Sequence, residues 1–138
     1  MVEHAYGCIP FKRTPEREVV CLMILRHGGF WEFPKGKPEK GESEQATAER
    51  ELKEETGLTG ELTPDAPIDS RYVFHRKGVA YDKRVRYFFC RVSDAAPVTV
   101  QKSEVNDFAW LPLEDLMDRA TYPQMKEVAR KVLQALAD

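Results

Sequence analysis

One stretch, residues 36–58, constrains this chain of 138 residues more than any other. It begins as a predicted loop, because residues that interrupt helices and strands crowd together there: Gly36, Pro38 and Gly41. From Ser43, a typical N-cap, the composition changes to Ala, Glu, Arg, Leu and Lys, which favour a helix. Gly57 is a typical C-terminal stop. The sequence therefore predicts a loop followed by a helix over residues 43–56.

Three carboxylates of this predicted helix share one face, since Glu51, Glu54 and Glu55 are spaced three and four residues apart. Like charges at this spacing repel one another and weaken a helix. A hard divalent cation, which prefers oxygen ligands, would offset that repulsion. Ala48 and Leu52 lie beside the acidic face and predict a contact with a sheet. The alternative is an acidic helix that is simply solvated.

The loop and the helix together match, at every constrained position, the motif G-x5-E-x7-R-E-U-x-E-E-x-G-U, in which U is a bulky aliphatic residue. The matching residues are Gly36, Glu42, Arg50, Glu51, Leu52, Glu54, Glu55, Gly57 and Leu58. This motif is the Nudix box, and the chain resembles the Nudix hydrolase family. The resemblance implies an α+β fold, an α/β/α sandwich in which a mixed, curved β-sheet lies between helices.

The resemblance also implies a metal site. In Nudix enzymes the glutamates that match Glu51, Glu54 and Glu55 bind a divalent metal, usually with the backbone carbonyl that matches Gly36. The expected cofactor is Mg²⁺, with Mn²⁺ as a substitute, because these hard cations prefer carboxylate and phosphate oxygens. Glu104, in a loop before the last predicted strand, resembles the glutamate that many members place opposite the box as an extra ligand or general base. The general base of the expected hydrolysis is either Glu51 or Glu104.

Two further box residues have implied supporting roles. Arg50 resembles the family arginine that orients one of the glutamates, and Glu42 resembles the glutamate that supports the loop. The alternative for Glu42 is an acid near a helix N-terminus, which the helix dipole favours by a few tenths to about 1 kcal/mol.

The whole chain reads as a single domain, residues 1–138, with 42% hydrophobic and 32% charged residues. The net charge of −2 gives no reason to expect broad attraction to nucleic acid or membranes. No apolar run approaches the length of a membrane span, and the N-terminus lacks the features of a signal peptide. We therefore expect a cytoplasmic protein. The three cysteines are expected to be buried thiols rather than disulfides or zinc ligands: Cys8, Cys21 and Cys90.

Hydrophobic periodicity predicts strands before and after the box helix. Pro10 suggests that the first strand is an edge strand or carries a bulge. The predicted strands cover residues 4–11, 18–25, 30–33, 70–76, 84–92, 97–101 and 104–111. Two helices are predicted at the end of the chain, over residues 112–119 and 122–137, and the second carries an apolar stripe that we assign to the core. Residues 77–83 are either a hairpin connection or a mobile loop.

Basic residues concentrate in one segment, residues 71–91, which holds seven Lys and Arg side chains and a single acid, Asp82. We interpret the segment as a phosphate clamp that includes Lys83 and Arg86, with Lys35 as a further phosphate contact. Because strand side chains alternate, only half of them reach any one face. The alternative is that these charges only keep an edge strand soluble.

Several aromatic side chains are candidates to stack on a purine base, among them Tyr87 and Tyr122. The others are Tyr72, Phe74 and Phe89. For most of them the alternative, packing in the core, is the simpler interpretation. Tyr122 precedes a proline at a predicted helix start, where a side chain is well placed to line the rim of a pocket.

Residues 31–37, WEFPKGK, resemble the lead-in of the asymmetric diadenosine tetraphosphate hydrolases, which produce ATP and AMP. Those enzymes often show W-x-x-P-K-G-H, whereas this chain has Lys37 at the last position. The expected substrate is a nucleotide polyphosphate. The alternatives are a house-cleaning nucleoside triphosphate pyrophosphohydrolase, an enzyme acting on an RNA 5′ end, and a non-catalytic nucleotide-binding module. The protein is expected to be a monomer or a homodimer.

Overall fold

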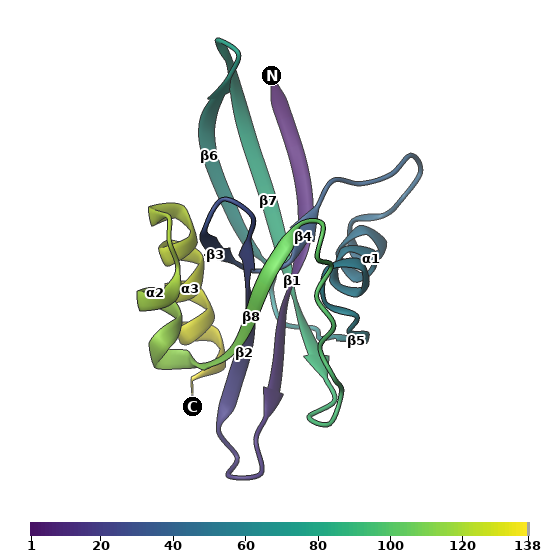
Figure 1. The fold of residues 1–138 in the computed structure, drawn as a ribbon, viewed down its shortest axis with the longest axis vertical. Helices are drawn as coiled ribbons and strands as arrows, with labels where there is room; N and C mark the ends of the chain where they lie inside the picture. The colour runs from purple at the N-terminus through teal and green to yellow at the C-terminus, as the bar shows by residue number, and fades with distance from the viewer. Residues whose placement is uncertain (138) are drawn as a thin grey trace.

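In the computed structural model, residues 1–137 are described and form an eight-stranded sheet with helices on both faces (Figure 1). The strands are β1 (Val2–Arg13), β2 (Val19–Arg26), β3 (Phe30–Glu32), β4 (Lys35–Gly36), β5 (Gly60–Leu62), β6 (Ile68–Arg76), β7 (Val79–Val92) and β8 (Val105–Pro112). The helices are α1 (Glu44–Thr56), α2 (Leu116–Arg119) and α3 (Pro123–Leu136), and a short 3-10 turn, Leu113–Asp115, leads into α2. This architecture confirms the predicted α+β sandwich. No helix within these residues is long and apolar enough to cross a bilayer.

β1 is the central strand of the sheet. It pairs in parallel with β7 over ten residues, from Val2 to Phe11, and its other edge pairs antiparallel first with β4 and then with β2. The sheet is therefore mixed, as predicted. The expected edge position of Pro10 is wrong. Pro10 is tolerated inside a central strand because it lies between the two antiparallel partners, where its missing N–H leaves no ladder bond unmade.

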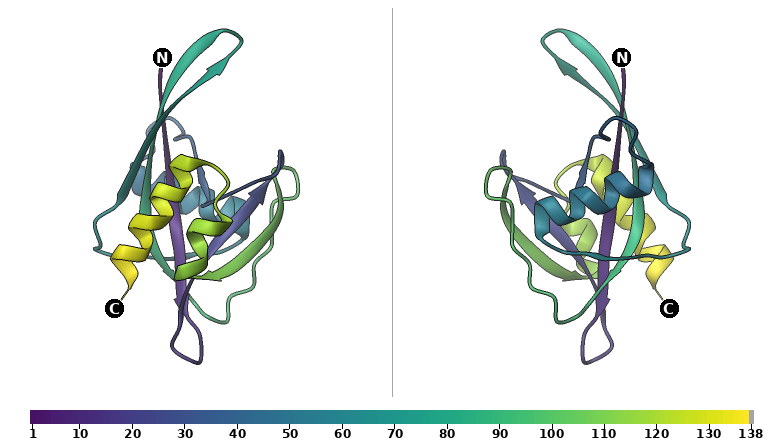
Figure 2. Two further views of the ribbon diagram at one scale, coloured as in Figure 1. Left: turned by 90° about the vertical axis from the view of Figure 1, so that its left-hand side faces the viewer. Right: turned by 90° about the vertical axis from the view of Figure 1, so that its right-hand side faces the viewer.

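The alternation of side chains in β1 and β7 builds a hydrophobic core on each face of the sheet. Figure 2 shows α1 on one face and α2 and α3 on the other. The core under α3 contains Ile9, Tyr87, Phe89 and Val128, and the core under α1 contains Cys8, Ala48, Leu52 and Cys90. These contacts confirm the predicted sheet contact of the box helix and the core stripe of α3. All three cysteines are buried thiols, as expected.

The box helix forms where its sequence predicts. Ser43 caps it, because its side chain accepts a hydrogen bond from the backbone N–H of Ala46. Gly57 ends it in the left-handed conformation, with φ of 74°, and donates its backbone N–H to the carbonyl of Lys53. The helix boundaries therefore follow from its capping residues.

Several segments differ from their predicted structure. Residues 35–36 form the short strand β4, and the predicted helix over residues 112–119 consists of the end of β8, the 3-10 turn and α2. Residues 97–101 are not a strand, because their backbone caps the end of α1: Thr99 and Gln101 donate N–H groups to the carbonyls of Thr56 and Glu55. Residues 60–62 lie in a stretch that the sequence predicts as loop, yet they form β5 against the end of β7.

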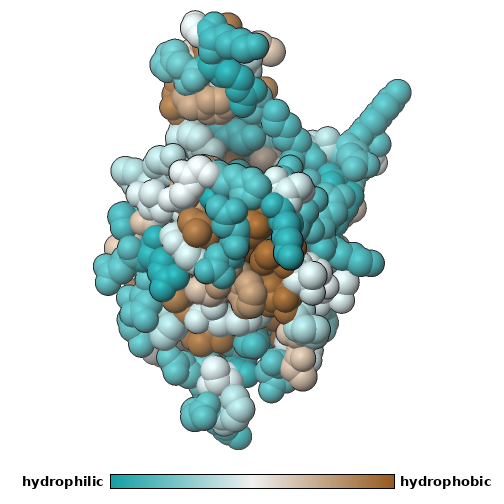
Figure 3. All heavy atoms as spheres, viewed as in Figure 1, coloured by the Kyte–Doolittle hydropathy of each residue, from teal (hydrophilic) through white to brown (hydrophobic). Residues whose placement is uncertain are grey.

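Residues 77–83 belong to a hairpin. The chain reverses over Lys77 and Gly78, whose φ angles are both positive, 51° and 78°. Such a pair produces the tight turn that matches the twist of two antiparallel strands. The β6–β7 hairpin stands above the rest of the molecule beside the N-terminus (Figure 1), and its surface carries both hydrophobic and hydrophilic side chains (Figure 3).

Candidate active site

Arg50 ties the box loop to the box helix. Its guanidinium donates to both carboxylate oxygens of Glu42, at 2.7 and 3.0 Å, and to the backbone carbonyl of Lys37 at 2.9 Å. It also donates to Glu51 at 2.9 Å and to Glu54 at 3.2 Å. The hydrogen bonds from Arg50 are the main reason that the pKa of Glu42 falls to about 2. Arg50 therefore orients Glu51 and, together with Glu42, fixes the shape of the loop, in agreement with the role that the resemblance implies.

Gly36 lets the Glu51 carboxylate approach the backbone of the loop. A Cβ atom at this position would overlap that carboxylate, so no residue with a side chain fits here without displacing Glu51. The requirement is steric rather than conformational, since Gly36 does not have a positive φ. Because the first glycine of the box has no side chain, the Glu51 carboxylate lies directly against the backbone of the loop.

Glu55 is almost fully buried, at 1% exposure, and lies between helix and sheet. Its carboxylate accepts two hydrogen bonds from Nη2 of Arg26, at 2.8 and 2.9 Å, and one from the backbone N–H of Lys35 at 3.1 Å. Burial nevertheless raises the pKa of Glu55 to about 7, and the neighbouring carboxylate of Glu51 adds to this rise. Burial also raises the pKa of Glu51. The two acids therefore lie close together in a poorly solvated region, where ionising both of them is unfavourable.

Arg26 is a site residue that the sequence analysis missed. It is the last residue of β2, and it forms ion pairs with Glu32 of β3 and with Glu55, and a longer contact of 3.9 Å with Glu104. Glu32 is itself only 7% exposed. The available signal was an arginine at the end of one apolar strand and a glutamate at the end of the next, but charged residues are common at strand ends. The arginine holds buried carboxylates from two other elements.

The box residues surround a cavity of about 480 Å³. It is lined by Arg26, His27, Lys35, Gly36, Lys37, Glu51, Glu55, Lys83, Ser103 and Glu104. Glu104 lies in the loop before β8, where the backbone N–H of His27 donates to its carbonyl at 3.0 Å. Its side chain is 58% exposed, and its closest ion pair is the long one to Arg26. The cavity thus brings together four of the five predicted metal ligands.

Glu54 is the fifth predicted ligand, and it does not line this cavity. Its side chain is 45% exposed and lies beside Arg50. Across residues 1–137, no three His, Cys, Asp or Glu side chains are gathered closely enough to hold a metal ion as they stand. Arg26 and Arg50 occupy the carboxylates instead.

The residues present still fit a divalent cation. Glu51 lies so close to the backbone that only glycine fits at position 36, and burial raises the pKa of Glu55 to about 7. Both features are typical of carboxylates that bind hard cations, which prefer oxygen donors from side chains and backbone alike.

A second cavity, of about 540 Å³, adjoins the first and shares Arg26, Lys35 and Lys83 with it. Aromatic side chains from three elements line it: Phe30, Tyr72, Phe74 and Tyr122. The Tyr122 ring is 46% exposed and lies 5.3 Å from the ring of Phe30. The predicted rim position of Tyr122 is what the structure shows, and Lys35 and Lys83 lie where the charged cavity meets the aromatic one.

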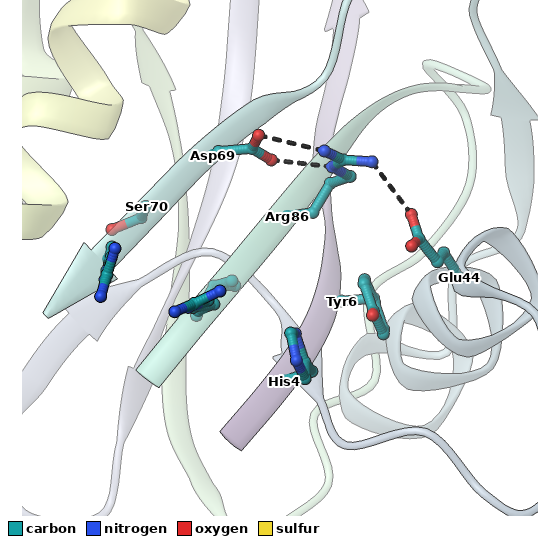
Figure 4. A pocket seen from close by; sticks show the side chains of 9 residues that line it. His4, Tyr6, Glu44, Asp69, Ser70 and Arg86 are labelled. Atoms are coloured by element: carbon teal, nitrogen blue, oxygen red, sulfur yellow. Dashed lines mark hydrogen bonds and ion pairs between the residues drawn. The ribbon is translucent and has the colours of Figure 1, made fainter. Parts of the chain in front are cut away.

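Of the predicted binding residues, Arg86 does not reach either of these cavities. Arg86 lies on the opposite face of β7 from Lys83, where it pairs with Asp69 at 2.8 Å and Glu44 at 3.2 Å (Figure 4). The clamp prediction was wrong for Arg86 because its odd spacing from Lys83 sends the two side chains to opposite faces. Tyr87 does line the aromatic cavity, but it is only 1% exposed, and its ring packs against Phe33 at 6.0 Å. It is a core residue and offers no face to a base.

Comparison with known proteins decides the family. The NUDIX domain model matches residues 3–136. The chain belongs to the Nudix family. The asymmetrical bis(5′-nucleosyl)-tetraphosphatase of Caenorhabditis elegans is 31% identical to this Nudix protein over 140 residues, which cover 99% of each chain. A crystal structure of C. elegans Ap4A hydrolase superposes with a TM-score of 0.79 at 26% identity, covering 99% of this chain and 100% of that one.

One of the other relatives is considerably longer than this chain. The 8-oxo-(d)GTP phosphatase of Mycolicibacterium smegmatis is 32% identical over 117 residues, which cover 78% of this chain but 31% of that protein. The chain therefore spans about a third of the length of this relative, whereas it matches the C. elegans protein from end to end.

Proposed function

We propose that this Nudix hydrolase cleaves diadenosine tetraphosphate to ATP and AMP with the help of Mg²⁺. The observation that carries the proposal is the pair of adjoining cavities: one holds carboxylates, the other holds aromatic rings, and lysines line the border between them. A dinucleoside polyphosphate has the matching order of parts, with a phosphate chain beside a base. The full-length similarity to the C. elegans tetraphosphatase supports the same substrate class.

Glu51, Glu55 and the backbone carbonyl of Gly36 would hold the cation, and Glu54 is the further predicted ligand on the same helix. When bound, the cation polarises the phosphate oxygens and lowers the pKa of a bound water. The role of Arg50 is to keep Glu51 against the loop, and the role of Arg26 is to keep Glu55 ionised between helix and sheet.

Glu104 is the general base in this proposal. Arg50 holds Glu51 at 2.9 Å and Arg26 holds Glu55 at 2.8 Å, so those carboxylates are already engaged. Glu104 lines the same cavity and has only the long contact with Arg26. It accepts a proton from the attacking water, whose oxygen forms a bond to phosphorus as the bond to the bridging oxygen breaks.

Lys35 and Lys83 bind the polyphosphate, because their ammonium groups lie on the border of the two cavities. Positive charge in a partly desolvated site stabilises the charge that develops on the phosphoryl oxygens. Tyr122 stacks on the adenine from the rim of the aromatic cavity, an interaction worth about 1–3 kcal/mol per base.

Product analysis tests the proposal. The protein is incubated in three separate reactions, each containing Mg²⁺. The substrates are diadenosine tetraphosphate, nucleoside triphosphates, and RNA bearing a 5′ triphosphate. We expect ATP and AMP from the dinucleotide, with a higher kcat/KM than for the other substrates. Glu55→Gln should abolish turnover, whereas Arg130→Gln, a change of an exposed residue on α3, should not. Preferential release of pyrophosphate from a nucleoside triphosphate or from RNA would overturn the assignment in favour of those substrates.

A further inference from the structure

Glu3 lies near the start of β1, directly opposite Lys83 in the parallel ladder with β7. Its carboxylate lies 3.4 Å from Nζ of Lys83, 3.2 Å from Nζ of Lys37 and 3.8 Å from Nη1 of Arg76. The side chain of Glu3 is 15% exposed. One carboxylate therefore gathers three cations, which come from β7, from the box loop and from the end of β6.

The three cations have no other acidic partner within residues 1–137, where every ion pair formed by Lys37, Arg76 or Lys83 goes to Glu3. The group thus keeps an excess of positive charge. Lys37 lines the carboxylate cavity, Arg76 lines the aromatic cavity, and Lys83 lines both. The excess positive charge therefore lies between the cavity proposed for the adenine and the cavity in which the phosphorus is attacked.

Charge and burial show what Glu3 does for this group. Burial raises the pKa of Glu3, but hydrogen bonds from Lys37 and Lys83 outweigh burial, and the pKa lies below its ordinary value. Burial lowers the pKa of Lys83, and the nearby ammonium groups of Lys35 and Lys37 lower it further, whereas Glu3 raises it. Glu32, Arg26 and Tyr72 line the same cavity as Lys83. Glu3 is therefore the ionised group that holds repelling cations together.

We propose that Glu3 is a positioning residue of the substrate site. Its carboxylate holds Lys37, Lys83 and Arg76 close together before substrate binds, and the same cations, still held by Glu3, then bind the phosphate oxygens. This inference rests on the proposed function, because it assumes that the cations meet a phosphate chain. Groups that are ordered before binding lose less conformational freedom on binding, so the arrangement strengthens polyphosphate binding without touching the reacting atoms.

The test compares Glu3→Gln, which keeps the shape of the side chain and removes its charge, with Glu16→Gln. Glu16 is exposed in the turn at the opposite end of β1, far from the cavities. Calorimetric titration with inorganic tripolyphosphate, without metal, measures binding separately from catalysis. We expect Glu3→Gln to weaken this binding, and to raise KM for the dinucleotide, by about three- to tenfold with kcat unchanged. Glu16→Gln should change neither quantity.

A second variant, Glu3→Asp, keeps the charge on a shorter side chain and should fall between wild type and Glu3→Gln. Equal or tighter tripolyphosphate binding by Glu3→Gln would overturn the inference, since Glu3 would then only compete with phosphate. A fall in kcat with unchanged binding would also overturn it. If Glu3→Gln weakens tripolyphosphate binding but the wild type does not cleave the dinucleotide, the proposed function fails and the positioning role stands.

Discussion

Nη2 of Arg26 donates to both carboxylate oxygens of Glu55, at 2.8 and 2.9 Å. Because Arg26 ends β2 and Glu55 lies on α1, this pair joins the central sheet to the box helix. Glu55 is 1% exposed, so its charge has almost no access to water. A buried ion pair of this kind adds little stability by itself, but removing one partner leaves the other as a buried charge without compensation.

Arg26→Ala should therefore destabilise the protein by about 3 kcal/mol, since it leaves Glu55 and Glu32 buried without their guanidinium partner. The loss should be smaller at acidic pH, where Glu55 is protonated and no longer carries a charge. Urea unfolding at two pH values measures both effects. Arg130→Ala, which breaks the exposed pair with Glu127 on α3, should have no measurable effect. A loss that does not depend on pH would contradict the role assigned to Arg26.

Metal affinity should increase as the pH rises through about 7, because the pKa of Glu55 is about 7 and a cation must displace its proton. Without metal, the free energy of unfolding should change with pH in the opposite direction to the metal affinity. The folded pKa exceeds the ordinary value of 4.5, so the free energy of unfolding should fall as the pH rises from 4.5 to about 7. Mn²⁺ titration and urea unfolding across this range measure the two trends. Both trends should be largely lost in Glu55→Gln, and a flat Mn²⁺ affinity in the wild type would refute the prediction.

Gly36→Ala should lower Mn²⁺ affinity by at least about tenfold, because the added Cβ displaces the Glu51 carboxylate from the loop backbone. Mn²⁺ titration followed by paramagnetic resonance gives the affinity. Gly29→Ala is the control: its φ of 86° makes the substitution strained, but its Cβ meets no atom within 4 Å. The control should lose some stability, of the order of 1 kcal/mol, and keep its metal affinity. Equal affinity of both variants would exclude the steric role of Gly36.

Lys83→Ala and Arg86→Ala form a matched pair, since the two residues lie on opposite faces of one strand. Lys83→Ala should raise KM for the dinucleotide about tenfold or more, because a charge-assisted contact with phosphate is lost. Arg86→Ala should leave KM unchanged, because Arg86 is engaged with Asp69 and Glu44 away from the cavities (Figure 4). Steady-state kinetics of both variants measure the difference, and a comparable rise in KM for Arg86→Ala would show that substrate also reaches that face.

Tyr122→Ala should raise KM for the adenine dinucleotide about tenfold, in line with the loss of one base–aromatic stack. Tyr122→Phe keeps the ring beside Phe30 and should behave like the wild type. Binding of inorganic tripolyphosphate, which has no base, should be the same in both variants. Weaker tripolyphosphate binding by Tyr122→Ala would indicate a general disturbance of the cavity rather than a lost stack.

Local signals were sufficient for most of the fold. The limits of α1 follow from Ser43 and Gly57, whose side-chain and backbone properties act within one turn of the helix. The buried strand β2 and the apolar stripe of α3 were likewise predicted from the local pattern of hydrophobic residues. Residues 60–62 and 97–101 were misassigned because their conformation depends on distant partners, the end of β7 and the end of α1. Pro10 was placed at an edge for the same reason, since its neighbours come from separate parts of the chain.

The site was predictable where one motif holds its residues in a fixed frame. Gly36, Arg50, Glu51 and Glu55 belong to that frame; the structure places Gly36, Glu51 and Glu55 around one cavity, and Arg50 donates a hydrogen bond to Glu51. The roles of Arg26 and Glu3 depend on which strands become neighbours, which no local spacing reveals. Arg86 shows the complementary limit. A count of basic residues along β7 contains no information about faces until the register of the strand is known.

The parallel ladder between β1 and β7 also governs the order of folding. Glu3 and Lys83, neighbours in that ladder, are 80 residues apart in the chain. On the ribosome, β1 emerges well before β7 and therefore waits for its main partner while the segments between them are synthesised. Contacts between such distant segments slow folding, because a long loop must close before they form. Until then one edge of the strand that becomes the centre of the sheet stays open, and a chain truncated before β7 would keep that aggregation-prone edge permanently.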